Sequence, residues 1–193
     1  VSTRPWPRAA AAVGGASAVG AGMVLSTPLV KASQDAMTFE SRMIDIRKVL
    51  NDVSPAQLTK IERGILSMST RIPIAAEGLG QIAAEGARAG IAAKDLLTFT
   101  EGAAKMAAAF DMAAEESGAM QAQWQTGLGL SIPQINTLGD KVNALTNKFG
   151  GAAKNVTDMI TRVGPLGKVA GVASGEMAAM AQLLDKVGVN SEI

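Results

Sequence analysis

The chain contains no cysteine and no histidine among its 193 residues, and it also lacks tyrosine. Without cysteine or histidine it cannot build a zinc finger, a thiol nucleophile, a Ser-His triad or an imidazole base. Disulfide bonds are excluded as well, so the sequence does not require an oxidising compartment. An enzyme would have to depend on carboxylates, lysine or serine alone. We therefore expect no enzyme, and no catalytic, cofactor-binding or metal-binding residues.

Aromatic residues and excess charge are also scarce. Aromatics make up 3% of a chain that is 48% hydrophobic, so its apolar residues are mostly alanine with Leu, Ile, Val and ten Met. Alanine favours helices but buries little area. Because no stretch alternates with the period of a β-strand, the sequence predicts an all-α protein of short helices and helical hairpins. The net charge of +1 gives no general attraction to nucleic acid, and we expect no sequence-specific nucleic-acid binding.

Residues 1–31 differ from the rest and are predicted to form an irregular lead and an uncharged, Ala- and Gly-rich N-terminal arm. Pro5 and Pro7 disfavour regular structure at the start, and residues 9–30 contain no charged side chain. That stretch is long enough to cross a bilayer as a helix, but few of its apolar side chains are large. Three interpretations stay open: burial against copies of itself or an enclosing protein wall, membrane activity, or an ordinary buried helix. We expect Pro28 to break or kink the helix.

Residues 32–193 are predicted to form one helical domain. Apolar residues recur at helical spacing up to about Asn51, and Ser54, Pro55 and Gln57 then form the expected start of a second helix. Further stops are predicted by glycine, proline and polar clusters. The expected breaks lie near Val53, Ile72, Gly90, Gly129, Gly150–Gly151 and Gly164–Gly171. The helix that begins after Gly90 is expected to end near Asp111.

A recurring turn pattern is the most informative feature of this domain. Gly90, Gly129 and Gly171 are each followed by an aliphatic residue and a new helical stretch, and Gly188 begins the pattern again. Glycine can take the left-handed position that ends a helix, and the next aliphatic residue closes the cap. The spacings of 39 and 42 residues suggest helical-hairpin units of about 40 residues. The alternative is that the same turn chemistry arose independently at each site.

Other patterns have simple interpretations. The adjacent Glu115 and Glu116 point about 100° apart on a helix, which favours a solvated face over a shared site. The Gly-x-Gly pairs at Gly78 and Gly127 lack the preceding strand of a nucleotide-binding loop. The methionines are interpreted as core residues, with an adaptable contact surface as the alternative; among them are Met106, Met112, Met120, Met159, Met177 and Met180.

Four blocks of sequence lie between Phe39 and the end of the chain: Phe39–Val49, Ile82–Ile91, Ala103–Glu116 and Val163–Gly171, the last followed by the Gly188-Val189 turn. Together they resemble the helical domain of phage tail tape measure proteins. The resemblance starts near Phe39, covers about 155 residues, and keeps the blocks in the order of that family. The lead ending at Pro28 is also similar to what precedes the domain in the family.

This resemblance implies a structural protein of the virion and a piece of a longer chain. Such a protein occupies the lumen of the tail tube, sets tail length during assembly and leaves with the DNA at ejection. The implied partners are further copies of itself (a homo-oligomer, as a trimer by analogy), the tail tube protein, tail tip or baseplate hub proteins, and tail assembly chaperones. Residues 9–30 would be the contact with a host membrane. The alternatives are a membrane-perturbing, pore-forming helical protein, or the tape measure of a phage-tail-like contractile injection device.

Overall fold

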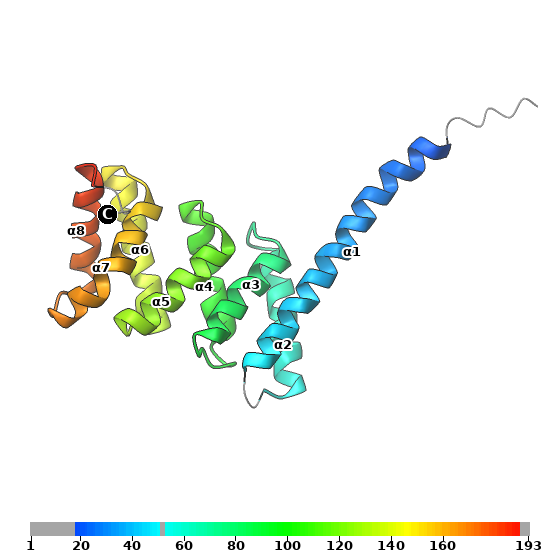
Figure 1. Ribbon diagram of the computed structural model, residues 1–193, viewed down its shortest axis with the longest axis horizontal. Helices are drawn as coiled ribbons and strands as arrows, with labels where there is room; N and C mark the ends of the chain where they lie inside the picture. The colour runs from blue at the N-terminus through cyan, green and yellow to red at the C-terminus, as the bar shows by residue number, and fades with distance from the viewer. Residues whose placement is uncertain (1–17, 51–52, 190–193) are drawn as a thin grey trace, which may run out of the picture. The chain divides into compact units, whose positions relative to one another are not determined.

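The computed structural model describes residues 18–50 and 53–189, and all regular structure in these ranges is α-helical (Figure 1). The predicted all-α class is confirmed. The irregular lead and the first part of the arm lie outside the described residues. The helices are α1 (Ala18–Val49), α2 (Pro55–Ser69), α3 (Ala76–Arg88), α4 (Leu96–Phe110), α5 (Ala114–Leu128), α6 (Ile132–Phe149), α7 (Ala153–Val169) and α8 (Ser174–Lys186).

The chain divides by internal contacts into two units, Val1–Met37 and Thr38–Ile193. In the first unit, α1 runs through Pro28 without interruption, so the predicted break there is wrong. A proline inside a helix removes one backbone hydrogen bond and strains one turn, and the rest of the ladder can still continue. The predicted division after residue 31 stays a prediction.

The second unit is a stack of helices in two layers. The odd-numbered helices α3, α5 and α7 pack in succession, and so do the even-numbered helices α2, α4, α6 and α8. Each helix also packs against the next one along the chain from α2 onward. The hairpins α3–α4, α5–α6 and α7–α8 therefore repeat one arrangement, and their first helices begin at Ala76, Ala114 and Ala153, about 38 or 39 residues apart. Hairpins of the predicted size are present, while their descent from one ancestral unit stays a prediction.

The helix ends follow local side-chain and backbone chemistry. Gln57 N–H donates to Ser54 Oγ at 3.2 Å, and Ser54 N–H donates to Gln57 Oε1 at 2.9 Å. This is the predicted capping box at the start of α2, with Pro55 as its first residue. A similar return bond joins Ser131 N–H to Gln134 Oε1 at the start of α6.

The predicted left-handed glycines are confirmed. Gly90, Gly129, Gly171 and Gly188 have φ angles of 85°, 67°, 77° and 79°. After Gly90 and Gly171 the next residue closes the cap, because Ile91 N–H donates to Gly86 O and Val172 N–H donates to Gly167 O.

The helix end predicted near Asp111 is confirmed. The expected breaks between helices do not include this position, yet α4 ends at Phe110 and a turn separates it from α5, which begins at Ala114. Asp111 itself takes the left-handed conformation at φ 51°, and Met112 N–H donates to Ala107 O at 3.0 Å, as after a glycine cap. Asp is one of the few residues besides glycine that visits this region.

The predicted break at Gly164–Gly171 begins too early, because α7 continues to Val169 and the chain turns only after it. Gly164 and Gly167 have a packing role instead. A Cβ atom at Gly164 would overlap the Leu128 side chain of α5, and one at Gly167 would overlap Met177 of α8. These glycines let α7 approach its neighbours closely.

The interior of the second unit consists of two hydrophobic clusters. The first joins buried residues of α1 to α4 with Ala122 of α5 and has Phe99, Leu96 and Ile82 near its centre. The second joins buried residues of α4 to α8 around Trp124, Ile135 and Val142. Among the methionines, Met106, Met112, Met120 and Met159 are buried and therefore core residues, whereas Met180 is exposed.

Candidate functional site

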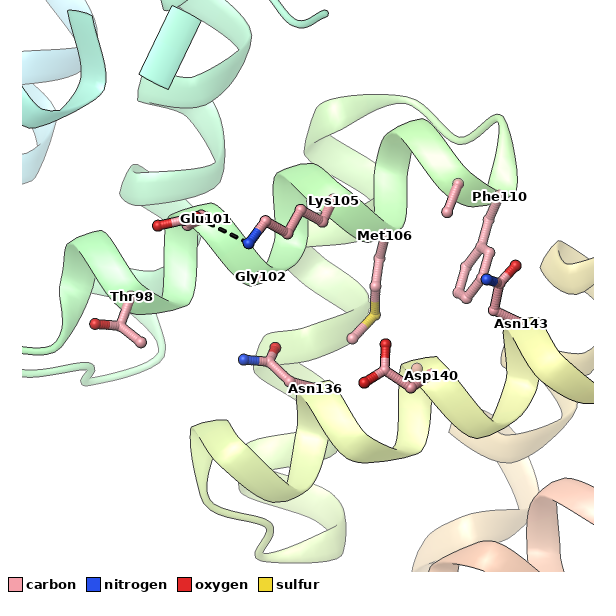
Figure 2. Close-up of a pocket in the computed structure, with 11 residues that line it drawn as sticks. Thr98, Glu101, Gly102, Lys105, Met106, Phe110, Asn136, Asp140 and Asn143 are labelled. Atoms are coloured by element: carbon pink, nitrogen blue, oxygen red, sulfur yellow. Dashed lines mark ion pairs between the residues drawn. The ribbon is translucent and has the colours of Figure 1, made fainter. Parts of the chain in front are cut away.

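One cleft of the second unit separates α4 from α6. It has a volume of about 410 Å³. Figure 2 shows Glu101, Lys105 and Met106 of α4 facing Asn136, Asp140 and Asn143 of α6 across it. Of these residues only Met106 was named individually from the sequence, as a core methionine, because the cleft itself depends on which helices become neighbours.

Two of the polar groups in this cleft form an ion pair with each other. Lys105 Nζ lies 2.9 Å from Glu101 Oε1. The hydrogen bond from Lys105 lowers the pKa of Glu101; burial opposes this shift, and the charges of Lys105 and Arg71 add to it. Asn136 Oδ1 is buried and has no hydrogen-bond partner among the described residues. The cleft thus offers amide groups for hydrogen bonding, and its glutamate is held as the ionised partner of a lysine.

Close backbone approach shapes the cleft wall. A Cβ atom at Gly102 of α4 would overlap Asn136 Oδ1 of α6, and one at Gly139 of α6 would overlap the end of Met106. Both glycines therefore lie where one helix receives a side chain of the other. We interpret the cleft as a consequence of this packing and not as a catalytic centre.

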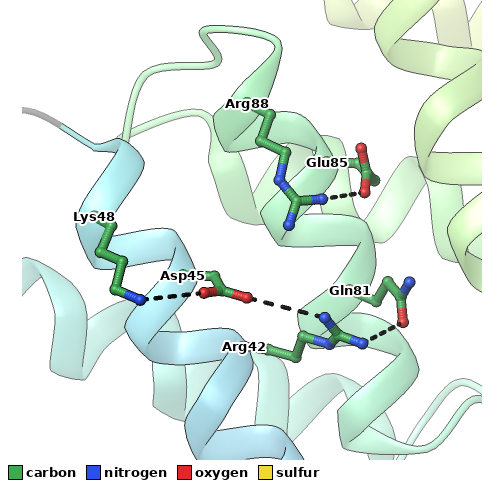
Figure 3. Close-up of polar contacts among 6 residues, drawn as sticks. All are labelled: Arg42, Asp45, Lys48, Gln81, Glu85 and Arg88. Carbon is green, nitrogen blue, oxygen red and sulfur yellow. Dashed lines mark hydrogen bonds and ion pairs between the residues drawn. The ribbon is translucent and has the colours of Figure 1, made fainter.

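A second polar feature links the end of α1 to α3 (Figure 3). Arg42 Nη2 donates to Gln81 Oε1 at 3.3 Å, while Arg42 and Lys48 lie 3.9 and 3.8 Å from the carboxylate of Asp45. The ion pairs are partly exposed, and pairs of this kind stabilise a fold by about 0–1 kcal/mol. The Arg42–Gln81 bond positions the last turns of α1 on α3, which is a structural role.

The third feature is an apolar surface on α7 and α8. Leu166, Val169, Leu183 and Val187 have exposed fractions of 72%, 89%, 67% and 74%. A small cavity of about 100 Å³ opens between the two helices and is lined by Met159, Val163, Gly167, Met177, Met180 and Leu184, among others. We call the exposed residues Val163, Leu166, Val169, Met180, Leu183, Leu184 and Val187 the α7–α8 face. It can take part in apolar packing but has no group suited to chemistry.

The adjacent glutamates behave as two separate side chains. Glu115 is exposed, while Glu116 forms an ion pair with Lys154 of α7. They do not share a site, as the helical geometry predicted. Within residues 18–50 and 53–189, no group of three or more Asp or Glu side chains is arranged to hold a metal ion.

The arm was also considered as a membrane-active segment. Among the described residues, no helix combines the length and the apolar character needed to cross a membrane. Residues 9–17 lie outside that search. Contact of residues 9–30 with a membrane stays a prediction.

Two comparisons with known proteins find phage tail proteins. The family described as phage-related minor tail protein matches residues 62–193. The chain is also 27% identical over 185 residues to the probable tape measure protein of Halomonas phage phiHAP-1, an alignment that covers 89% of this chain and 21% of that relative. The chain therefore spans about a fifth of the relative's length. No solved structure matches the chain.

Proposed function

Because the chain belongs to the family of phage-related minor tail proteins, we propose that it forms the folded helical domain of a tail tape measure protein. The similarity to a probable tape measure protein extends over 89% of the chain and supports this proposal. The protein would act as a structural component of the virion tail. A membrane-perturbing protein is not favoured by either comparison.

The position and timing of its action are part of the same proposal. The domain would lie in the lumen of the tail tube or at its tip during assembly, and would leave with the DNA at ejection. Its contacts would be further copies of itself, with three-fold symmetry by analogy, the tail tube protein, tail tip or baseplate hub proteins, and tail assembly chaperones. Family membership is what supports these partners.

Within a tape measure protein, we propose that this domain is a plug and not the ruler. A polypeptide sets length where it is extended, and a continuous helix rises about 1.5 Å per residue. Here the chain folds into hairpins after α3, α5 and α7, and the longest helix after α1 has 18 residues. Successive hairpins lie side by side in two layers, so residues added in one hairpin do not lengthen the chain's span by their full helical rise. The observation that carries the proposal is this folding back of the chain.

An in-frame deletion of one hairpin tests the proposal. Removing Ala114–Ala152 joins the turn residue Ala113 directly to Ala153, the first residue of α7. We expect tails of unchanged length in electron micrographs, because a packed hairpin is lost and a similar one takes its place. If the segment were extended as a helix, the 39 deleted residues would shorten the tail by about 58 Å.

A duplication of the same residues is the matched control. It adds one hairpin and should also leave tail length unchanged. Lengthening by about 58 Å at 1.5 Å per residue would show that the segment measures length, and would contradict the proposal. The duplication remains informative if the deletion variant fails to assemble tails, because it retains every native contact of α2 to α5.

A further inference from the structure

One contact between neighbouring helices of a layer recurs at the same sequence position in several helices of the stack. In α3, α4 and α5, the side chain five residues before the left-handed turn residue contacts the next helix of its own layer. Trp124 lies five residues before Gly129 and donates from Nε1 to Thr161 Oγ1 of α7 at 2.8 Å. Met106 lies five residues before Asp111 and packs onto Gly139 of α6.

The first hairpin follows the same register. Glu85 lies five residues before Gly90, and its Cβ is 3.4 Å from the position of a Cβ built on Gly118 of α5. The position is therefore occupied by a glutamate, a methionine and a tryptophan in three helices, and in each case the next helix of the same layer lies against it. Geometry and not residue type makes this position an interhelical contact.

The last hairpin has the same positions, but they are uncovered. Leu166 lies five residues before Gly171, and Leu183 lies five residues before Gly188. Their exposed fractions are 72% and 67%, against 0% for Trp124 and 6% for Met106. Both leucines belong to the α7–α8 face. That face is where a further hairpin would pack if the stack continued in the same register.

The turn after α8 repeats the backbone hydrogen bonds of the turn between α7 and α8. Gly188 has φ 79°, its N–H donates to Asp185 O, and Val189 N–H donates to Leu184 O at 3.0 Å. The turn between α7 and α8 has the same bonds, from Gly171 to Lys168 O and from Val172 to Gly167 O.

We propose that the α7–α8 face docks a further helical hairpin, and that the stretch of the same polypeptide that follows Val189 supplies it. The relative's length, about five times the aligned part, leaves room for such a stretch. The docked hairpin would place a small residue under Leu166 and another under Leu183, as Gly139 lies under Met106. This inference concerns the packing of the stack and does not depend on the role of the domain in a tail.

Single-cysteine variants test the proposal, since the native chain has no cysteine. Leu166→Cys and Leu183→Cys introduce thiols into the α7–α8 face. Ala144→Cys, at an exposed residue of α6, is the control for a surface position, and Ala178→Cys, at a buried residue of α8, reports that the hairpin is folded. Each variant is made in the 193-residue chain and in the polypeptide encoded by the complete reading frame. The rate of reaction with a maleimide dye is measured for both.

We expect the thiols of the Leu166→Cys and Leu183→Cys variants to react at least about tenfold more slowly in the longer polypeptide, because a buried thiol reacts only after local opening. The Ala144→Cys thiol should react at the same rate in both, and the Ala178→Cys thiol should stay protected in both. Removing the 40 residues after Ile193 from the longer polypeptide should restore fast reaction. Equal rates in both polypeptides would overturn the proposal, as would a reading frame that ends at Ile193.

Two further outcomes identify a different occupant and would also overturn it. Protection that grows with protein concentration, together with a dimer or trimer in light scattering, would show that a second copy covers the face. Protection that survives removal of the 40 residues would show that a more distant segment covers it. In either case the register of the stack would not continue along the chain.

Discussion

Trp124 and Leu166 occupy the same place in successive hairpins, five residues before the turn glycine, yet one is fully buried and the other is 72% exposed. Trp124 of α5 is covered by α7, the next helix of its layer, whereas no described helix follows α7 within that layer. The difference shows that the burial of a side chain in this fold depends on its position in the stack and on whether another hairpin packs beside it. An apolar residue at that position is a core residue only where the stack continues.

The largest expected effect comes from truncating the two side chains of this pair. Trp124→Ala should lower the free energy of unfolding by about 3–5 kcal/mol, because it leaves a cavity between α5 and α7 and removes the hydrogen bond to Thr161. Leu166→Ala should change it by less than about 0.5 kcal/mol, as for other exposed substitutions. Guanidinium denaturation of both variants measures the difference. Similar losses in the two variants would mean that Leu166 is covered in solution.

Two glycines allow a comparison between a helix contact that has no room for a β-carbon and one that has room. Gly86 of α3 faces the buried ring of Phe99, and a Cβ atom there would come within 2.6 Å of the ring. Gly86→Ala should therefore destabilise the protein by about 1–3 kcal/mol through overpacking. Gly127 of α5 has room for a Cβ, which would meet Pro165 at an ordinary 3.4 Å.

The matched variant Gly127→Ala should stabilise the protein by about 0.4–1 kcal/mol, because alanine restricts the unfolded chain and favours the helix. Thermal unfolding of the two variants checks the opposite signs. If both variants lost stability, helix spacing around α5 would be tighter than the structure shows.

The left-handed turn residues of two helices, Gly129 and Asp111, allow a further comparison with smaller expected effects. Gly129→Ala should cost about 1–2 kcal/mol, because a β-carbon is strained in the left-handed conformation. Asp111→Gly should raise the free energy of unfolding by about 0.5 kcal/mol, since strain is relieved but the unfolded chain gains freedom. Urea denaturation measures both. A loss of stability in Asp111→Gly would show that the aspartate side chain itself holds the turn.

The smallest expected effect concerns Glu101 in the cleft between α4 and α6. Its pKa is lowered in the folded protein, chiefly by the hydrogen bond from Lys105, so its contribution to stability is present above the ordinary pKa of 4.5 and is lost as the pH falls through the folded pKa. The pair is partly exposed, so the contribution is no more than about 0.5 kcal/mol. Glu101→Gln should remove this part of the pH dependence below about pH 4.5 while leaving the helix content by circular dichroism unchanged. An unchanged acid dependence of unfolding would contradict this assignment.

Several helix ends could be predicted because their signals are local. Ser54 and Gln57 form a capping box within four residues. Gly90 and Gly171 terminate helices through backbone hydrogen bonds that span six residues. Asp111 was named only as the approximate end of one helix, because an aspartate gives a weaker signal than glycine for the same left-handed turn. Gly164 was taken for a stop because glycine is ambiguous: it ends helices and also permits close approach between them.

For the candidate site, the sequence predicted only the kind of protein, a structural one, and not which residues would line a cleft or surface. The sequence lacks the residues of the common catalytic and metal centres, and it resembles a structural tail protein. The cleft between α4 and α6 and the α7–α8 face were not foreseen, because both arise from residues that are distant in sequence. Leu166 and Val169 lie in a block quoted for the family resemblance, and their exposure follows from what lies beside them.

The sequence by itself determined the helical class, most helix boundaries and the hairpin length, since these depend on hydrogen bonds and backbone preferences within a few residues. Only the tertiary structure decided that the hairpins stack in two layers, which glycines separate helices and which end them, and which apolar side chains are covered. The physical reason is that hydrophobic burial depends on neighbours in space. The same leucine can be core or surface according to whether another helix lies on it.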